Sequence, residues 1–227
     1  MTVLYLFDID GTLLHARSAG RAALDAVFAE HHGLPAASAG IRFGGKTDPA
    51  IIDDIFAARR GRPATVAERA QVLAAYLPRL RAELVAGGVE VLPGVVEALA
   101  FLAARPEVAL GIATGNVREG AAAKLELAGL EGWFALGGYG CDSPVHAELV
   151  ACAIDRGRVH GPVREVVVVG DTIHDIAAAR ACAATVCAVT TGADPAEALA
   201  HADVVFTSLA ELPAWHAQRF ARLAPQP

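Results

Sequence analysis

The sequence predicts an α/β protein: a Rossmann-like core, with a three-layer parallel sheet, that carries an inserted all-helical domain. Short apolar runs alternate with stretches of helical spacing, and strands separated by helices form parallel sheets with helices on both faces. No comparable strand pattern occurs between residues 15 and 88. We therefore expect a core of residues 1–15 and 89–227 and a helical insertion of residues 16–88. The predicted strands cover residues 3–7, 108–113, 165–169, 185–189 and 203–207.

Three helices are predicted within the insertion, at residues 15–31, 49–60 and 65–85. Apolar residues recur at helical spacing in the first helix, and Gly33 ends it. Asp48 is expected to cap the second helix, which Pro49 opens. Glycine pairs at 44–45 and 87–88 are expected to act as hinges.

Beyond the insertion, helical and strand patterns alternate to the end of the chain. This alternation is the basis for expecting a sheet of parallel strands. The predicted helices cover residues 95–104, 117–128, 147–156, 174–181, 195–201 and 209 to about 223, with a short strand and loop within 133–139.

The composition favours a globular protein with a large core and limits the class of partner. The chain has 227 residues, 54% of them hydrophobic. A net charge of −6 without long basic blocks argues against nucleic-acid or anionic-membrane binding. The N-terminal segment lacks the features of a secretion signal and is too short to span a bilayer, so a cytoplasmic location is expected. The four cysteines show no C-x-x-C spacing and are expected in the core.

Two carboxylates stand where the first predicted strand ends. Asp8 and Asp10 are two residues apart, so their side chains can face one site at the carboxyl edge of the sheet, where α/β proteins bind ligands. Two close anions need a cation or a shared proton, and Mg²⁺ meets this need. Gly11 allows a sharp turn, and Thr12 offers a hydroxyl and an N–H to an anion.

The run Asp8-Ile9-Asp10-Gly11-Thr12-Leu13 resembles the first motif of the haloacid dehalogenase superfamily, the aspartate-nucleophile phosphatases and phosphomutases. Thr114-Gly115-Asn116 is similar to the second motif, and the segment 170–175 is similar to the acidic fourth motif. The order and spacing resemble the phosphoglycolate-phosphatase-like branch. The insertion lies where this superfamily has a helical cap.

The resemblance implies specific roles for these residues. Asp8 would be the nucleophile that forms an aspartyl-phosphate, and Asp10 the general acid and then the general base. The implied Mg²⁺ ligands are the Asp8 carboxylate, the Asp10 backbone carbonyl and Asp171, with Asp175 more distant from the ion. Phosphoryl oxygens would bind to the Thr114 hydroxyl and to the backbone N–H groups of Gly115 and Asn116.

The third motif is irregular. The resemblance implies a basic residue between about residues 140 and 150, and the chain offers only His146 there. Either His146 supplies the positive charge, or Arg118 or Arg164 replaces it, or the site is impaired. Lys124 lies about two turns into its helix, roughly 10 Å from the helix start, and is expected to be structural.

In the insertion, Lys46 or Arg42 is expected to pair with a second anionic group of the substrate. These observations favour a Mg²⁺-dependent phosphomonoester phosphatase that acts on a small phosphorylated metabolite. Phosphoglycolate as the substrate follows from the resemblance alone. Two alternatives stay open: a phosphomutase of the β-phosphoglucomutase type, and a binding or regulatory homologue that has lost efficient chemistry. The sequence does not decide the oligomeric state.

Overall fold

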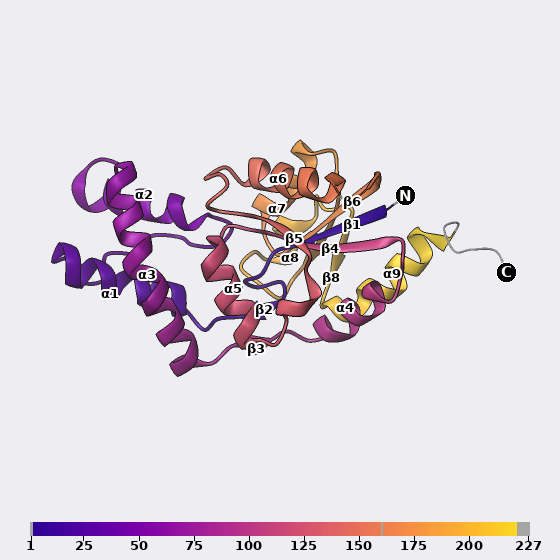
Figure 1. Ribbon diagram of the computed structural model, residues 1–227, viewed down its shortest axis with the longest axis horizontal. Coiled ribbons are helices and arrows are strands. Elements are labelled where there is room, and N and C mark those ends of the chain that lie inside the picture. The colour runs from indigo at the N-terminus through magenta and orange to yellow at the C-terminus, as the bar shows by residue number, and fades with distance from the viewer. Residues whose placement is uncertain (1, 160, 222–227) are drawn as a thin grey trace.

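The computed structural model describes residues 2–159 and 161–221. Its centre is a six-stranded parallel sheet with the strand order β5-β4-β1-β6-β7-β8. Helices cover both faces of this sheet (Figure 1), as the sequence predicted. The strands are β1 (Thr2–Phe7), β4 (Val108–Thr114), β5 (Leu136–Tyr139), β6 (Val163–Gly170), β7 (Thr185–Val189) and β8 (Val204–Phe206).

The central strand β1 is buried on both sides because its side chains alternate between two hydrophobic clusters. Val3, Tyr5 and Phe7 face a cluster that includes residues of α4, α5 and α9. Leu4 and Leu6 face a cluster built with α6, α7 and α8. The core helices are α4 (Val95–Ala103), α5 (Arg118–Leu127), α6 (His146–Val159), α7 (Ile173–Ala181), α8 (Ala196–Leu199) and α9 (Leu212–Arg219), with short 3-10 helices at η1 (Glu131–Trp133) and η2 (Leu209–Glu211).

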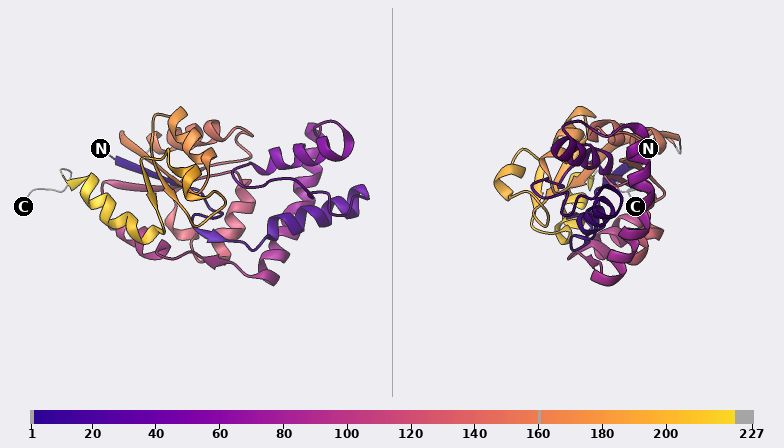
Figure 2. Two further views of the ribbon diagram at one scale, coloured as in Figure 1. Left: turned by 180° about the vertical axis from the view of Figure 1, so that it is seen from behind. Right: turned by 90° about the vertical axis from the view of Figure 1, so that its left-hand side faces the viewer.

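The insertion consists of α1 (Ala19–His32), α2 (Asp48–Arg60) and α3 (Val66–Gly87). These helices lie together at one end of the molecule, opposite the C-terminus (Figures 1 and 2). The chain enters and leaves the insertion through a short antiparallel pair, β2 (Leu14–His15) and β3 (Glu90–Val91), in which His15 stands opposite Glu90.

Two details of the insertion differ from the sequence predictions. The first helix begins at Ala19 and not at residue 15, because His15 belongs to β2 and the chain turns through positive φ angles at Arg17 and Ser18. The second helix is capped by Thr47, whose hydroxyl accepts from the N–H of Ala50. Asp48 is thus the first residue of α2, and its carboxylate is free to reach elsewhere.

The last helix, α9, ends at Arg219, and the predicted end near residue 223 lies outside the described residues. Within the described ranges, no helix has both the length and the apolar composition needed to cross a membrane.

Candidate active site

Three carboxylates converge at the carboxyl ends of two neighbouring strands. Asp8 follows β1, Asp171 follows β6, and Asp175 lies in the first turn of α7. One oxygen of each lies within 4.8 Å of the others, and all three residues are buried. The motifs at the ends of β1 and β6 meet because these parallel strands are adjacent in the sheet.

The charges in this cluster disfavour one another. Burial, followed by the neighbouring charges of Asp175 and Asp171, raises the pKa of Asp8 well above its usual value. Burial and Asp175 also raise the pKa of Asp171 to about 7. Burial alone would raise the pKa of Asp175 too, but contacts with His146 and Thr172 lower it below the usual value.

The cluster fits a hard divalent cation such as Mg²⁺, which binds oxygen ligands and would offset this repulsion. Asp8 and Asp171 are available as ligands, and the Oδ1 atom of Asp175 has no aligned hydrogen-bond donor within the described residues. The other oxygen of Asp175 accepts from the backbone N–H and the hydroxyl of Thr172, at 3.0 and 2.6 Å. This capping box fixes the carboxylate at the start of α7.

The loop after β1 differs in part from the sequence expectation. Gly11 lines the cavity of the site, as a contact to an anion requires. Thr12 does not: its backbone N–H donates to the Ile9 carbonyl at 3.3 Å, and its hydroxyl lies 3.4 Å from Asp171 Oδ1. Thr12 therefore supports Asp171 from behind, because the tight turn directs both of its donors away from the cavity.

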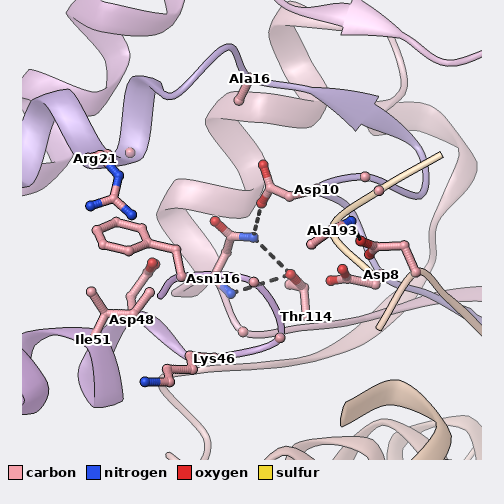
Figure 3. A pocket seen from close by; sticks show the side chains of 18 of the residues that line it. Asp8, Asp10, Ala16, Arg21, Lys46, Asp48, Ile51, Thr114, Asn116 and Ala193 are labelled. Carbon is pink, nitrogen blue, oxygen red and sulfur yellow. Dashed lines mark hydrogen bonds between the residues drawn. The ribbon is translucent and has the colours of Figure 1, made fainter. Parts of the chain in front are cut away.

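On the other side of Asp8, a polar network that is buried except at Asp10 links the second motif to Asp10 (Figure 3). The Asn116 side-chain amide donates to Asp10 Oδ2 and to the Thr114 hydroxyl, each at 2.8 Å. The backbone N–H of Asn116 also donates to that hydroxyl, at 3.3 Å. With both acceptor positions of its oxygen in use, Thr114 has its own O–H free to donate to a ligand.

Lys124 completes this network, although its distance from the helix start had favoured a structural role. Its ammonium lies 2.6 Å from Asp10 Oδ2 and 2.7 Å from Asn116 Oδ1, and the residue is only 4% exposed. A helical side chain points back toward the N-terminus of its helix, which carries this long chain to the Asp10 loop. The sequence held a signal, because Lys124 shares the apolar face of α5 with Ala121 and Leu125.

The other candidate cations of the third motif are not part of this network. His146 lines the cavity, and its Nε2 atom is 3.1 Å from Asp175 Oδ1 without an aligned hydrogen bond. Burial lowers the pKa of His146, but Asp175, the Gly45 backbone and Asp171 together raise it, so the net shift is upward. The Arg118 guanidinium stacks over the Tyr139 ring at 4.3 Å. Arg164 is near the start of β6, about 20 Å along the strand from Asp171.

A cavity of about 720 Å³ opens over these groups, between the core and the insertion. Lys46 lines it, but its ammonium is 2.5 Å from Asp54 and points away from the carboxylates (Figure 3). Arg42 is paired with Asp194. Gly115 and Asn116 line the cavity beside Thr114, and Asp48, which sequence reasoning treated only as a helix cap, lines it too.

The model of the haloacid dehalogenase-like hydrolases matches residues 3–183. The chain belongs to this family. The family supports a hydrolase of the phosphatase type, and the resemblance seen in the sequence motifs is confirmed. No curated protein sequence matches the chain.

Solved structures of this haloacid dehalogenase-like fold resemble the chain over nearly its full length. A Bacteroides vulgatus protein described as a β-phosphoglucomutase has 19% identity and a TM-score of 0.72, with 99% of this chain and 91% of that chain covered. CbbY from Rhodobacter sphaeroides, in complex with phosphate, has 20% identity and a TM-score of 0.71, with 93% and 96% covered. A Lactobacillus plantarum protein described as a phosphoglycolate phosphatase has 20% identity and a TM-score of 0.67, with 93% and 98% covered. At these identities the likeness shows the fold.

Proposed function

We propose that this protein is a Mg²⁺-dependent phosphomonoester phosphatase that acts on a small phosphorylated metabolite through an aspartyl-phosphate. The observation that carries the proposal is the position of Asp8. A cluster of carboxylates suited to a cation lies on one side of it, and the Thr114, Asn116 and Lys124 network lies on the other. A nucleophile between a cation site and a set of hydrogen-bond donors is the arrangement that phosphoryl transfer requires.

In the first step, an Asp8 carboxylate oxygen attacks phosphorus and the bond from phosphorus to the ester oxygen breaks. Asp10 gives its proton to the leaving oxygen, so an alcohol and the aspartyl-phosphate result. Lys124 and Asn116 both donate to the Oδ2 atom of Asp10, which fixes the orientation of its carboxyl group. Among the described residues none hydrogen-bonds Oδ1, which is left to carry the proton.

In the second step, Asp10 takes a proton from a water molecule that attacks the same phosphorus. The bond from phosphorus to Asp8 then breaks, which releases inorganic phosphate and restores the enzyme. The Thr114 hydroxyl and the backbone N–H of Gly115 are proposed to hold phosphoryl oxygens in both steps, whereas the backbone N–H of Asn116, which the sequence also offered, donates to Thr114 instead.

Asp8, Asp171 and Asp175 would hold the Mg²⁺, together with the Asp10 carbonyl. When bound, the ion supplies positive charge that offsets the negative charge of the phosphoryl group and of the carboxylates. Lys124 is proposed to supply the second positive charge, in place of a residue from the third motif. With the charge of Lys124 in that role, the irregular third motif would not by itself impair the site.

The insertion is proposed to act as a cap that covers the reacting groups and excludes water. Lys46 would pair with a second anion of a phosphoglycolate-like substrate after release from Asp54. The cavity also has room for a larger sugar phosphate.

A panel of phosphorylated metabolites tests the proposal directly. The protein, with Mg²⁺ present or chelated, is assayed for phosphate release and for isomerisation of each compound. Phosphate release that needs Mg²⁺ and is abolished in Asp8→Asn supports the phosphatase. Isomerisation of a sugar phosphate without net phosphate release would assign a phosphomutase, and no turnover on any compound would refute both activities.

A further inference from the structure

The first turn of α2 makes two hydrogen bonds to the loop that carries the second motif. The Asp48 carboxylate accepts from the backbone N–H of Val117 at 2.8 Å, and the backbone N–H of Asp48 donates to the Gly115 carbonyl at 2.8 Å. The two bonds lie on either side of Asn116 in the chain. A residue of the insertion therefore holds both ends of the segment that orients Asp10 and Thr114.

Helix α5 lacks a side-chain cap of its own, because its N-cap residue is Val117. A carboxylate at a helix start satisfies an unpaired N–H and interacts favourably with the helix dipole. Asp48 supplies that carboxylate from helix α2 of the insertion. The residue is 7% exposed, so this contact is shielded from water.

The backbones around this contact approach so closely that side chains are excluded. A Cβ atom at Gly115 would lie 2.2 Å from the Lys46 carbonyl oxygen. A Cβ atom at Gly140, on the far side of the loop, would lie 2.1 Å from the Gly115 carbonyl oxygen. The loop is thus held between the insertion and the segment after β5, and small residues at both positions make this possible.

Holding Asp48 there has a cost. Burial raises the pKa of Asp48 to about 6, with the charge of Lys124 and the Val117 N–H acting in the opposite direction. A buried acceptor with a perturbed pKa beside a candidate active site is a frequent sign of a functional constraint.

We propose that Asp48 is a positioning residue, which fixes the loop of residues 114–117 in its phosphate-binding geometry only while the insertion is closed over the core. Closure would then do more than exclude water. It would set the orientation of Asn116, and through Asn116 that of Asp10 and Thr114. This inference rests on the proposed phosphatase activity, but the hydrogen bond itself can be tested without turnover.

Amide hydrogen exchange in the wild-type protein is the first test. Within the described residues, the N–H groups of Arg118 and Glu119 have no backbone partner, as is usual in a first helical turn, whereas the N–H of Val117 is bonded to Asp48. We expect the Val117 amide to exchange at least tenfold more slowly than those of Arg118 and Glu119. Equal rates would overturn the proposal, whether or not the protein proves to be a phosphatase.

Steady-state kinetics of substituted proteins are the second test. Asp48→Ala and Asp48→Leu remove the acceptor, and Leu nearly keeps the shape of the side chain in case the smaller residue impairs folding. A displaced loop should lower kcat about 10- to 100-fold, with a smaller change in KM. Asp48→Asn keeps an acceptor oxygen and should retain kcat within about threefold.

Asp53→Asn is the matched control, since Asp53 lies on the same helix but pairs with Arg69 inside the insertion. It should leave kcat and the exchange of the Val117 amide unchanged. If Asp48→Leu folds and keeps wild-type kcat while only its resistance to urea falls, Asp48 is merely structural and the proposal is wrong.

Discussion

Replacement of Lys124 is the sharpest test of the assignment of positive charge in this site. Lys124→Met keeps most of the length of the side chain but removes the ammonium that contacts Asp10 and Asn116 at 2.6 and 2.7 Å. If this ammonium stabilises the charge of the transferring phosphoryl group, kcat should fall about 10²- to 10³-fold, as it does on loss of one electrostatic contact in other active sites.

The loss of stability in Lys124→Met should not be enough to unfold the protein. The substitution leaves the Asn116 carbonyl oxygen without its donor, which costs about 1–3 kcal/mol for a buried acceptor. Relief from burying a charge offsets part of this cost. Because folded proteins are stable by about 5–15 kcal/mol, the variant should stay folded, and its lower kcat would not reflect unfolding.

The assay is phosphate release at saturating substrate and excess Mg²⁺, paired with urea unfolding of the same preparations. Arg118→Met is the matched control, since Arg118 is a cation on the exposed start of the same helix and stacks on Tyr139. It should keep near-normal kcat, and Lys124→Arg should recover only part of the lost activity because a planar guanidinium does not fit the same contacts. A Lys124→Met enzyme with a third or more of wild-type kcat would refute the reasoning and return Lys124 to a structural role.

Four further outcomes are expected. Asp8→Asn should lower turnover by several orders of magnitude with unchanged unfolding, and a variant that kept a tenth of the activity would exclude Asp8 as the nucleophile. His146→Ala should lower the activity or the Mg²⁺ affinity about 10- to 100-fold, because the contact between His146 and the proposed Mg²⁺ ligand Asp175 is lost. The measurement is the phosphatase activity as a function of Mg²⁺ concentration, and an unchanged curve would show that His146 has no role. Lys46→Ala should reduce kcat/KM more for a substrate with a second anion than for an aryl phosphate, and equal losses would contradict a role in specificity. Burial lowers the pKa of His216, so the folded protein holds it neutral while the unfolded chain takes up a proton near pH 6.5. Stability should therefore fall as the pH drops below about 6.5, and should fall less in His216→Gln; identical pH profiles in urea unfolding would show that His216 contributes nothing.

The fold and half of the site could be predicted from local patterns. The apolar runs marked every long strand of the sheet, and the parallel order of these strands placed Asp8, Thr114 and Asp171 at one edge. This prediction works because the carboxyl ends of parallel strands meet by geometry alone.

The rest depended on contacts between segments that are distant in sequence. Lys124 reaches Asp10 only because α5 lies alongside the loop after β1. The distance of about 10 Å between Lys124 and the start of its helix is therefore no guide to its distance from the site. Asp48 was read as a cap for its own helix, yet its partner belongs to another helix. The first helix was extended to His15 because a strand as short as β2 leaves no periodic signal.

The pairing of β2 with β3 has a consequence for how such a chain can be remodelled. Because His15 and Glu90 stand opposite each other, the two ends of the insertion are neighbours, as in an antiparallel hairpin. In topological terms, residues 16–89 form one very long hairpin loop between β2 and β3. The closure entropy of a loop grows only slowly with its length, so the stability of the sheet should depend little on the number of residues between these two ends. We therefore expect the core to tolerate replacement of the insertion by a segment of another length, because the β2–β3 pair would still hold the two ends together.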